Sequence, residues 1–130
     1  MSKYVSKVTR TQAVVKVTGT STSEIIDTGE LLFHDQTLDR DNVSLTITSI
    51  IYNVSAAANV TRDGNVIFAM AGNTVDEHNF AQSIGFSMNE KPNANVVVNV
   101  GTGESTVILQ FSKEAGYIDP EQQTLQPFER

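Results

Sequence analysis

The segment from Ala94 to Phe111, ANVVVNVGTGESTVILQF, constrains the fold more than any other part of the chain. It contains two runs rich in β-branched residues on either side of GTGE, and side chains alternate between the two faces of a strand. This alternation predicts a β-hairpin with Thr102 and Gly103 as its two loop residues. The register would put the apolar side chains of both strands on one face, at the centre of the core. The expected cross-strand pairs are Val100 with Ser105, Val98 with Val107, Val96 with Leu109 and Ala94 with Phe111.

Other segments also have the alternation or the β-branched content of strands. The strongest are 13–17 and 43–54, and alternation in the second fails at Ile50-Ile51, which predicts a bulge or a strand buried on both faces. Asp63-Gly64 favours a type I′ turn, which would pair Val60 with Ile67 and Thr61 with Val66. Weaker candidates are strands at 24–27, 31–33 and 85–88, and a helical turn over 76–83 that follows the capping-box spacing of Thr74 and Glu77.

The chain is predicted to form one all-β domain over residues 1–130. About eight short strands with turn signals between them predict an antiparallel β-sandwich or a jelly-roll-like barrel. Residues 1–12 are a candidate N-terminal arm, because polar side chains dominate the first ten positions. Residues 116–130 are expected to form an extended C-terminal tail, because Pro120 and Pro127 oppose a helix. The first residues do not resemble a secretory signal, and no apolar run approaches membrane-spanning length.

Charge is distributed unevenly along the chain, whose net charge is −6. The first 23 residues contain four basic residues and no acid, whereas all fifteen acidic residues follow from Glu24 onward. An acidic body argues against general binding to nucleic acid, because that affinity comes mainly from cations that neutralise phosphates. A basic arm on an acidic body is instead expected to dock on an acidic neighbour.

No motif for catalysis stands out, and neither a cofactor nor a metal is predicted. The chain has no cysteine, which removes disulfides, thiolate catalysis and cysteine-bound metals. His34 and His78 are both expected in polar loops, without the pattern of a nucleophile elbow. The acidic loop 34–42 could offer oxygen ligands to calcium, but it lacks EF-hand spacing and is interpreted as a solvated loop. Residues 101–105 lack the lysine of a phosphate-binding loop and are interpreted as a turn.

The termini are the most promising contact surfaces. An exposed strand-forming arm offers free backbone N–H and C=O groups, and natural proteins hide such edges or use them to assemble. The hypothesis is that one or both arms reach a neighbouring subunit, and the alternative is that each arm lies along its own domain. The candidate assembly contacts are Lys3, Tyr4, Lys7, Arg10, Tyr117, Leu125 and Phe128.

The opening YVSKVTRTQAVVKVTGT, the segment VVVNVGTGESTVILQF and the proline-containing tail together resemble the small β-rich structural proteins of tailed-phage virions. The nearest likeness is to head decoration proteins, also called auxiliary or cement proteins. It lies in overall character along the chain and not in a signature motif, so no functional residue is carried over. The resemblance implies a β domain, often trimeric, that sits on a capsid lattice and braces neighbouring capsid subunits.

The resulting prediction is a virion structural protein without enzymatic activity, made in the host cytoplasm. Its expected partners are further copies of itself, as in a trimer, and the major capsid protein or another virion protein, with no membrane and no direct nucleic acid. A neck, tail or baseplate component is the alternative within this class. From other classes, a carbohydrate-binding module would need exposed rings among Tyr4, Tyr52 and Tyr117. A small β-sandwich enzyme would need His34 or His78 in a pocket beside a carboxylate.

Overall fold

The computed structural model describes residues 2–80 and 93–120 of the chain. These residues form strands joined by turns, with two short 3₁₀ segments, η1 (Thr28–Leu31) and η2 (Arg40–Asn42). The strands are β1 (Ser2–Val8), β2 (Gln12–Gly19), β3 (Thr22–Ile26), β4 (Thr37–Leu38), β5 (Ser44–Val54), β6 (Ala58–Arg62), β7 (Asn65–Met70), β8 (Thr74–Asn79), β9 (Val96–Val100), β10 (Ser105–Ala115) and β11 (Tyr117–Ile118). Within these ranges, no helix has the length and hydrophobicity needed to cross a membrane.

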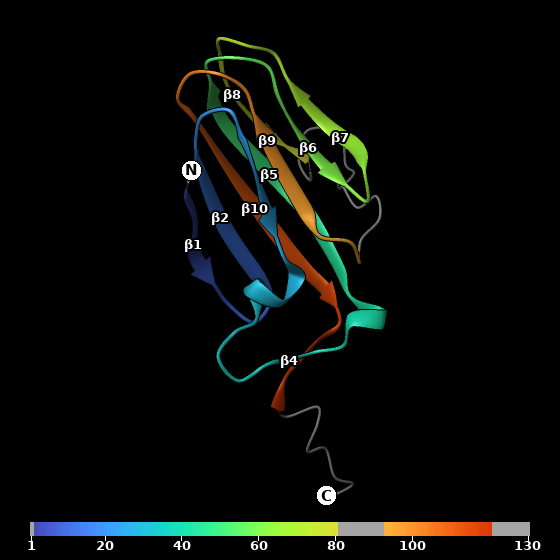
Figure 1. The fold of residues 1–130 in the computed structure, drawn as a ribbon. Coiled ribbons are helices and arrows are strands. Elements are labelled where there is room, and N and C mark those ends of the chain that lie inside the picture. Colours follow the sequence, from blue (N-terminus) through green and yellow to red (C-terminus); the bar gives the residue numbers. More distant parts are fainter. Residues whose placement is uncertain (1, 81–92, 121–130) are drawn as a thin grey trace, which may run out of the picture.

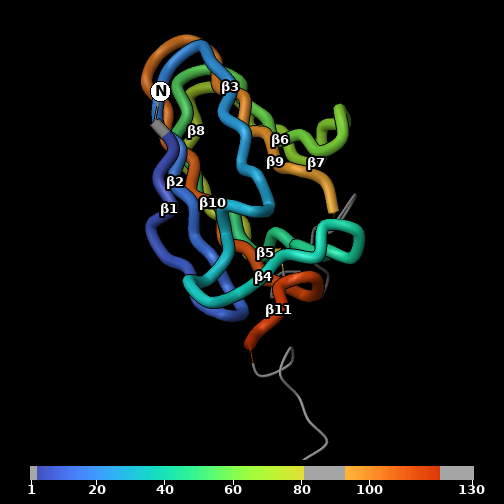
Figure 2. Tube along the Cα trace, turned by 60° about the horizontal axis from the view of Figure 1, so that its bottom comes forward, coloured from blue at the N-terminus to red at the C-terminus, as the bar shows by residue number. Residues whose placement is uncertain are grey.

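Two antiparallel sheets lie face to face and make up most of the fold (Figure 1). One sheet has five strands in the order β1-β2-β10-β5-β8, and the other has four in the order β3-β9-β6-β7. A short pair, β11 with β4, lies at one end of the molecule, as Figure 2 shows. The predicted antiparallel, sandwich-like all-β class is therefore confirmed.

The hydrophobic core lies between the inward faces of the two larger sheets, which contribute to a single cluster of buried side chains. Because a strand is pleated, every second side chain of each strand points inward and enters the core. Removing these apolar side chains from water is the main favourable contribution to folding. The fully buried members include Val15, Val17, Ile47, Ile50, Val107 and Leu109 from the larger sheet and Ile26, Val60, Val96 and Val98 from the smaller one.

The predicted hairpin at 94–111 is wrong in its pairing, although both of its runs are strands. β9 pairs with β3 and β6, whereas β10 pairs with β2 and β5 in the other sheet, so none of the four expected cross-strand pairs forms. The connection 101–104 passes between the sheets, and its Glu104 carbonyl accepts a hydrogen bond from Ser55 Oγ at 2.7 Å. The predicted inward faces are nevertheless correct. A strand alternates in the same way whether its apolar neighbours lie beside it or across the core.

The failed alternation in the 43–54 strand marks a real bulge. In the pairing of β5 with β10, Gln110 lies opposite Ser49 and Phe111 lies opposite Ile47, which leaves Thr48 as an extra residue on β5. An extra residue changes the parity that points inward. The prediction of a bulge in this strand is therefore confirmed, two residues before the point at which the sequence pattern breaks.

The hairpin expected around Asp63-Gly64 forms between β6 and β7, and both turn residues have positive φ, 51° and 79°. Thr61 pairs with Val66 as predicted. The predicted pair of Val60 with Ile67 is wrong, because the register shifts by one residue and Val60 pairs with Phe68.

Two short elements differ from the sequence prediction. Residues 74–79 form β8, which pairs with β5, so the helical turn predicted over 76–83 is wrong for its first residues; pairing along a long buried strand outweighs a local capping signal. Residues 81–83 lie outside the described residues. The strand expected at 31–33 is absent from the described structure. Asp27 and Glu30 instead form a capping box that starts η1, which ends at Leu31. The strand expected at 85–88 lies outside the described residues.

The N-terminal segment does not extend away from the body. Residues 2–8 form β1, which pairs with β2 along its own domain and makes one edge of the five-stranded sheet. The start of the expected C-terminal tail, Tyr117–Ile118, is β11. Residues 121–130 lie outside the described residues. Of the two arrangements considered from the sequence, the N-terminal arm therefore adopts the one in which it lies along its own domain.

Candidate assembly surface

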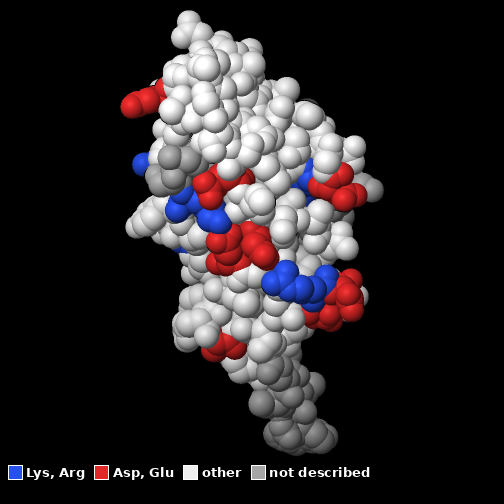
Figure 3. All heavy atoms as spheres, viewed as in Figure 1, with Lys and Arg blue, Asp and Glu red and all other residues white. Residues whose placement is uncertain are grey.

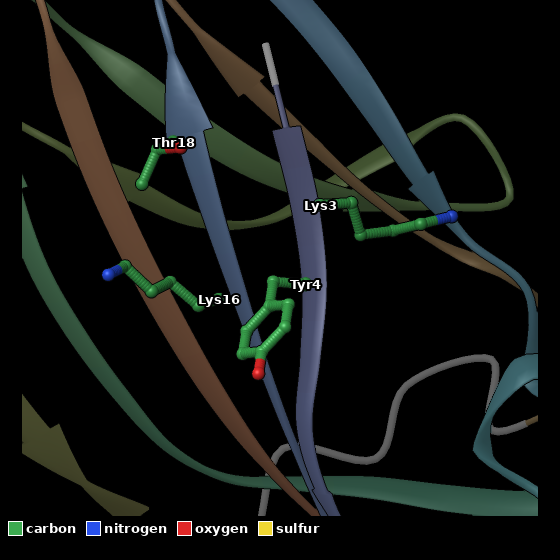
Figure 4. Close-up of a pocket in the computed structure, with 4 residues that line it drawn as sticks. All are labelled: Lys3, Tyr4, Lys16 and Thr18. Atoms are coloured by element: carbon green, nitrogen blue, oxygen red, sulfur yellow. The ribbon is translucent and has the colours of Figure 1, made fainter.

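The outer face of the β1–β2 hairpin combines an exposed ring with unneutralised basic side chains. Tyr4 on β1 is 64% exposed, and it lies across the sheet from Lys16 on β2. In Figure 4 the Tyr4 and Lys16 side chains extend from neighbouring strands beside a shallow hollow that Lys3 and Thr18 also line. Lys7 continues the same face, opposite Val14. Neither Lys7 nor Lys16 has an ion-pair partner within the described ranges, and β1 and β2 contain no acid, so this surface is positive.

Two of the predicted contact residues form ion pairs within the chain. Lys3 Nζ donates to the carbonyl of Ile25 at 2.8 Å and lies 2.7 Å from the Glu30 carboxylate, which fastens β1 to η1. The Arg10 guanidinium lies 2.8 Å from Asp35 and 2.9 Å from Asp119. The hydrogen bonds that the Arg10 guanidinium donates to both carboxylates raise the pKa of Arg10, and the guanidinium in turn lowers the pKa of Asp35. These two cations therefore stabilise the monomer.

Tyr117 is buried and is not available as a surface contact. It is 8% exposed, and its hydroxyl donates to the Thr28 carbonyl at 2.7 Å. Burial raises the pKa of its phenol to about 12. Leu125 and Phe128 lie outside the described residues. Of the seven predicted contacts, Tyr4 and Lys7 are the ones that remain exposed and form no ion pair among the described residues.

A buried polar cluster lies below this surface, where the turn between β1 and β2 meets β10. Lys113 is 8% exposed, and its Nζ donates to the Thr9 carbonyl at 2.6 Å and to Gln36 Oε1 at 3.0 Å. Gln36 Nε2 in turn donates to the Arg10 carbonyl and to Asp119. The cluster thus connects three distant parts of the chain. Burial lowers the pKa of the Lys113 ammonium to about 8, below its ordinary 10.5.

The low pKa of Lys113 predicts a rise in stability with pH. Between about pH 8 and pH 10 the unfolded chain keeps the proton on this lysine while the folded chain loses it, so the free energy of unfolding should increase by about 2 kcal/mol. Above pH 10 the raised pKa of Tyr117 acts in the opposite direction, because the unfolded phenol ionises first. Urea denaturation at pH 7, 8, 9 and 10 measures the slope. Lys113→Met should lack it, and parallel curves for the two proteins would refute the assignment.

The other candidates from the sequence have clear positions. His34 is in a loop against Phe33, as expected, but His78 lies on β8 and not in a loop, with its ring stacked on Tyr52 and its Nε2 3.5 Å from Asp76 Oδ2. Tyr52 is 6% exposed, so two of the three tyrosines proposed as sugar platforms are buried. In loop 34–42, no group of three or more acidic or histidine side chains among the described residues could hold a metal.

Sequence reasoning missed a row of outward residues across the centre of the five-stranded sheet. Lys16, Ile108, Ile51 and Glu77 are cross-strand neighbours on β2, β10, β5 and β8. Strand alternation assigns each of them to the outer face, but the row becomes visible only when the strand order is known. The incorrect hairpin placed Ile108 beside β9 and so hid its true neighbours.

The outer face of the four-stranded sheet is different, because its polar side chains bind one another. Ser23 Oγ donates to Asn99 Oδ1, and Asn99 Nδ2 donates to Asn59 Oδ1 at 2.8 Å, which makes a ladder across β3, β9 and β6. Figure 3 shows this side of the molecule, with charged side chains of both signs gathered across its middle and few near its upper end. Arg40 and Asp27, 3.3 Å apart, form one of the ion pairs near η1 and η2.

Comparison with known proteins adds little to these observations. No family model matches the chain, and no curated protein matches it significantly. Among solved structures, KdgF from Halomonas sp. is similar with 11% identity and a TM-score of 0.38, over 87% of this chain and 80% of that one. An uncharacterized conserved protein with a double-stranded β-helix domain from Klebsiella pneumoniae is similar with 10% identity and a TM-score of 0.36, over 88% and 75%.

One prediction is corrected by this comparison. The sequence analysis predicts a protein without enzymatic activity, and an enzyme, KdgF, is among the similar structures. The prediction that the protein lacks enzymatic activity is therefore not retained. With TM-scores below 0.5, these likenesses assign no activity, substrate or residue role to this chain.

Proposed function

We propose that this protein is a structural subunit of a tailed-phage virion, a head decoration protein that binds the capsid lattice through the edge strand β1. The observation that carries the proposal is that β1 is an edge of the five-stranded sheet and presents Tyr4 and Lys7 on its outer face. An edge strand offers backbone hydrogen-bonding groups to a second chain. Shallow contacts of this kind, repeated by lattice symmetry, add up to stable binding through multivalency.

Charge specifies the kind of lattice site that would suit this strand. The β1–β2 hairpin is positive while the whole chain is negative, so an acidic extended segment of a capsid protein would pair with it, whereas the same positive hairpin of another copy would be repelled from it. The burial of Tyr52 and Tyr117 leaves Tyr4 as the one exposed tyrosine among the three, which does not make a sugar-binding platform of several rings.

Virion particles purified from the source of the sequence provide the direct test. Quantitative mass spectrometry should find this protein in them at a copy number comparable to that of the major capsid protein, and antibody labelling should mark the heads. Labelling at the tail or neck would support the alternative location within the virion. Absence from purified particles would contradict the proposal.

Substitution of the two exposed β1 residues tests the contact itself. Tyr4→Asp with Lys7→Glu should weaken binding to capsid shells stripped of this protein by at least about tenfold, because both charge and apolar contact are lost. Co-sedimentation with the shells measures the affinity. A control for the position of the change is Val66→Asp, which places a charge at an exposed apolar residue on the edge strand β7 of the other sheet. Equal losses in both variants would contradict a role for β1.

A further inference from the structure

The outward row across the five-stranded sheet has a self-complementary order. From β2 to β8 it reads Lys16, Ile108, Ile51 and Glu77, so two apolar residues lie between a cation and an anion. Lys16 and Glu77 are exposed, and neither has an ion-pair partner in the part of the chain that the structure describes. Three strand spacings separate them, about 14 Å, so they do not neutralise each other within one molecule.

We propose that the partner on this face is a second copy of the chain, related by a twofold axis that runs along the strands between β10 and β5. This rotation reverses the row, so Lys16 of one copy lies opposite Glu77 of the second copy and Ile108 lies opposite Ile51 of the second copy. Each contact occurs twice, as an isologous interface requires. The charges meet at the margins and the isoleucines meet at the centre.

The neighbouring row fits the same operation. Thr106 and Asn53 lie two residues from the isoleucines on β10 and β5. The rotation places Thr106 of each copy opposite Asn53 of the other copy. Two side chains that can both donate and accept hydrogen bonds would therefore meet across the interface. The central pair is thus apolar with polar neighbours, the usual arrangement of a protein interface.

The overlap covers β2, β10, β5 and β8 and leaves β1 outside it. β1 lies one strand beyond Lys16, so the same twofold pair keeps the β1 edge open toward a third partner. The pairing is therefore independent of lattice binding through Tyr4 and Lys7. It also predicts a dimer in place of the trimer expected from the sequence resemblance.

The size of the overlap sets the expected affinity. Four strands span about 19 Å, and six residues of each span about 20 Å. This footprint of about 380 Å² per copy is smaller than the roughly 800 Å² per partner of a standard interface and is in the range of weak, transient contacts. We therefore expect a dissociation constant in the micromolar range and a reversible, concentration-dependent dimer.

A charge exchange tests the pairing. Lys16→Glu and Glu77→Lys each put like charges opposite one another at both contacts, so each should weaken the dimer by at least about tenfold. An equimolar mixture of the two variants restores opposite charges at both contacts, and so does the double variant K16E/E77K. Light scattering and sedimentation velocity over 1–200 µM, a range of roughly two decades around the expected constant, should therefore show a dissociation constant at least about tenfold higher for the single variants, and wild-type dimerisation for the mixture and the double variant.

Two controls have the same changes of net charge. Lys7→Glu lies on β1 outside the overlap, and Glu104→Lys lies in the connection between β9 and β10. Both should remain dimeric, although Lys7→Glu should still lose affinity for the capsid shells. A wild-type monomer throughout the range, a mass that grows without limit, or single variants that dimerise like the wild type would overturn the proposal. None of these results depends on whether the lattice proposal holds.

Discussion

Gly116→Ala is expected to lower the free energy of unfolding by about 3–5 kcal/mol, through backbone strain and steric overlap together. Gly116 joins β10 to β11 with a φ of 86°, a conformation that residues with a side chain rarely adopt. A Cβ at this position would lie 2.5 Å from Cα and 2.8 Å from the backbone N of Val43. The turn cannot easily move away, because the Gly116 carbonyl accepts a hydrogen bond from Asp39 N–H at 2.8 Å.

Gly64→Ala is the matched control for this prediction. Gly64 also has a positive φ, 79°, but a Cβ there would meet no atom within 4 Å. Its replacement should cost only the strain, about 1–2 kcal/mol. The difference between the two variants in urea denaturation therefore isolates the overlap with Val43. Equal losses of stability would show that the close packing of Gly116 against Val43 does not hold.

The sequence was sufficient to predict which residues of β9 and β10 face the core but not which strands are neighbours. The inward residues of β9 and β10, such as Val98 and Leu109, follow from alternation alone, because alternation depends only on the pleat of each strand. The pairing of those strands depends on the rest of the chain. GTGE can close a hairpin or cross between sheets, and only contacts such as that of Ser55 with Glu104 distinguish the two.

The same limit applies to the candidate site. The exposure of Tyr4 and Lys7 could be predicted from a polar, strand-forming N-terminus. The neutralisation of Lys3 and Arg10 could not, because their partners lie 27 residues away at Glu30 and 109 residues away at Asp119. The row from Lys16 to Glu77 likewise needs the order of four strands. The sequence thus showed that the N-terminal segment is basic, but it did not predict which of these cations form ion pairs in the folded chain.

Arg62→Ala is expected to lower the free energy of unfolding by about 3–4 kcal/mol, because a buried carbonyl and a half-buried one lose charged donors and a cavity remains. Arg62 is 0% exposed at the end of β6. Its Nη1 donates to the Leu45 carbonyl at 2.8 Å, and its Nη2 donates to the Ala94 carbonyl at 2.9 Å. Leu45 belongs to the opposite sheet, so the guanidinium connects the two layers in a place where neither sheet can pair with the other.

Arg62→Met separates the two causes of this loss. Methionine fills much of the volume of the arginine side chain but donates no hydrogen bond. The free energy of unfolding of Arg62→Met should therefore be about 1–2 kcal/mol higher than that of Arg62→Ala, and still lower than that of the wild type. Arg40→Ala, at a side chain that is 64% exposed, is the control and should change stability by less than about 0.5 kcal/mol. Urea denaturation with tertiary and secondary structure probes measures all three. An Arg62→Met protein as stable as the wild type would mean that packing alone joins the sheets here, and that the hydrogen bonds from the guanidinium add no net stability.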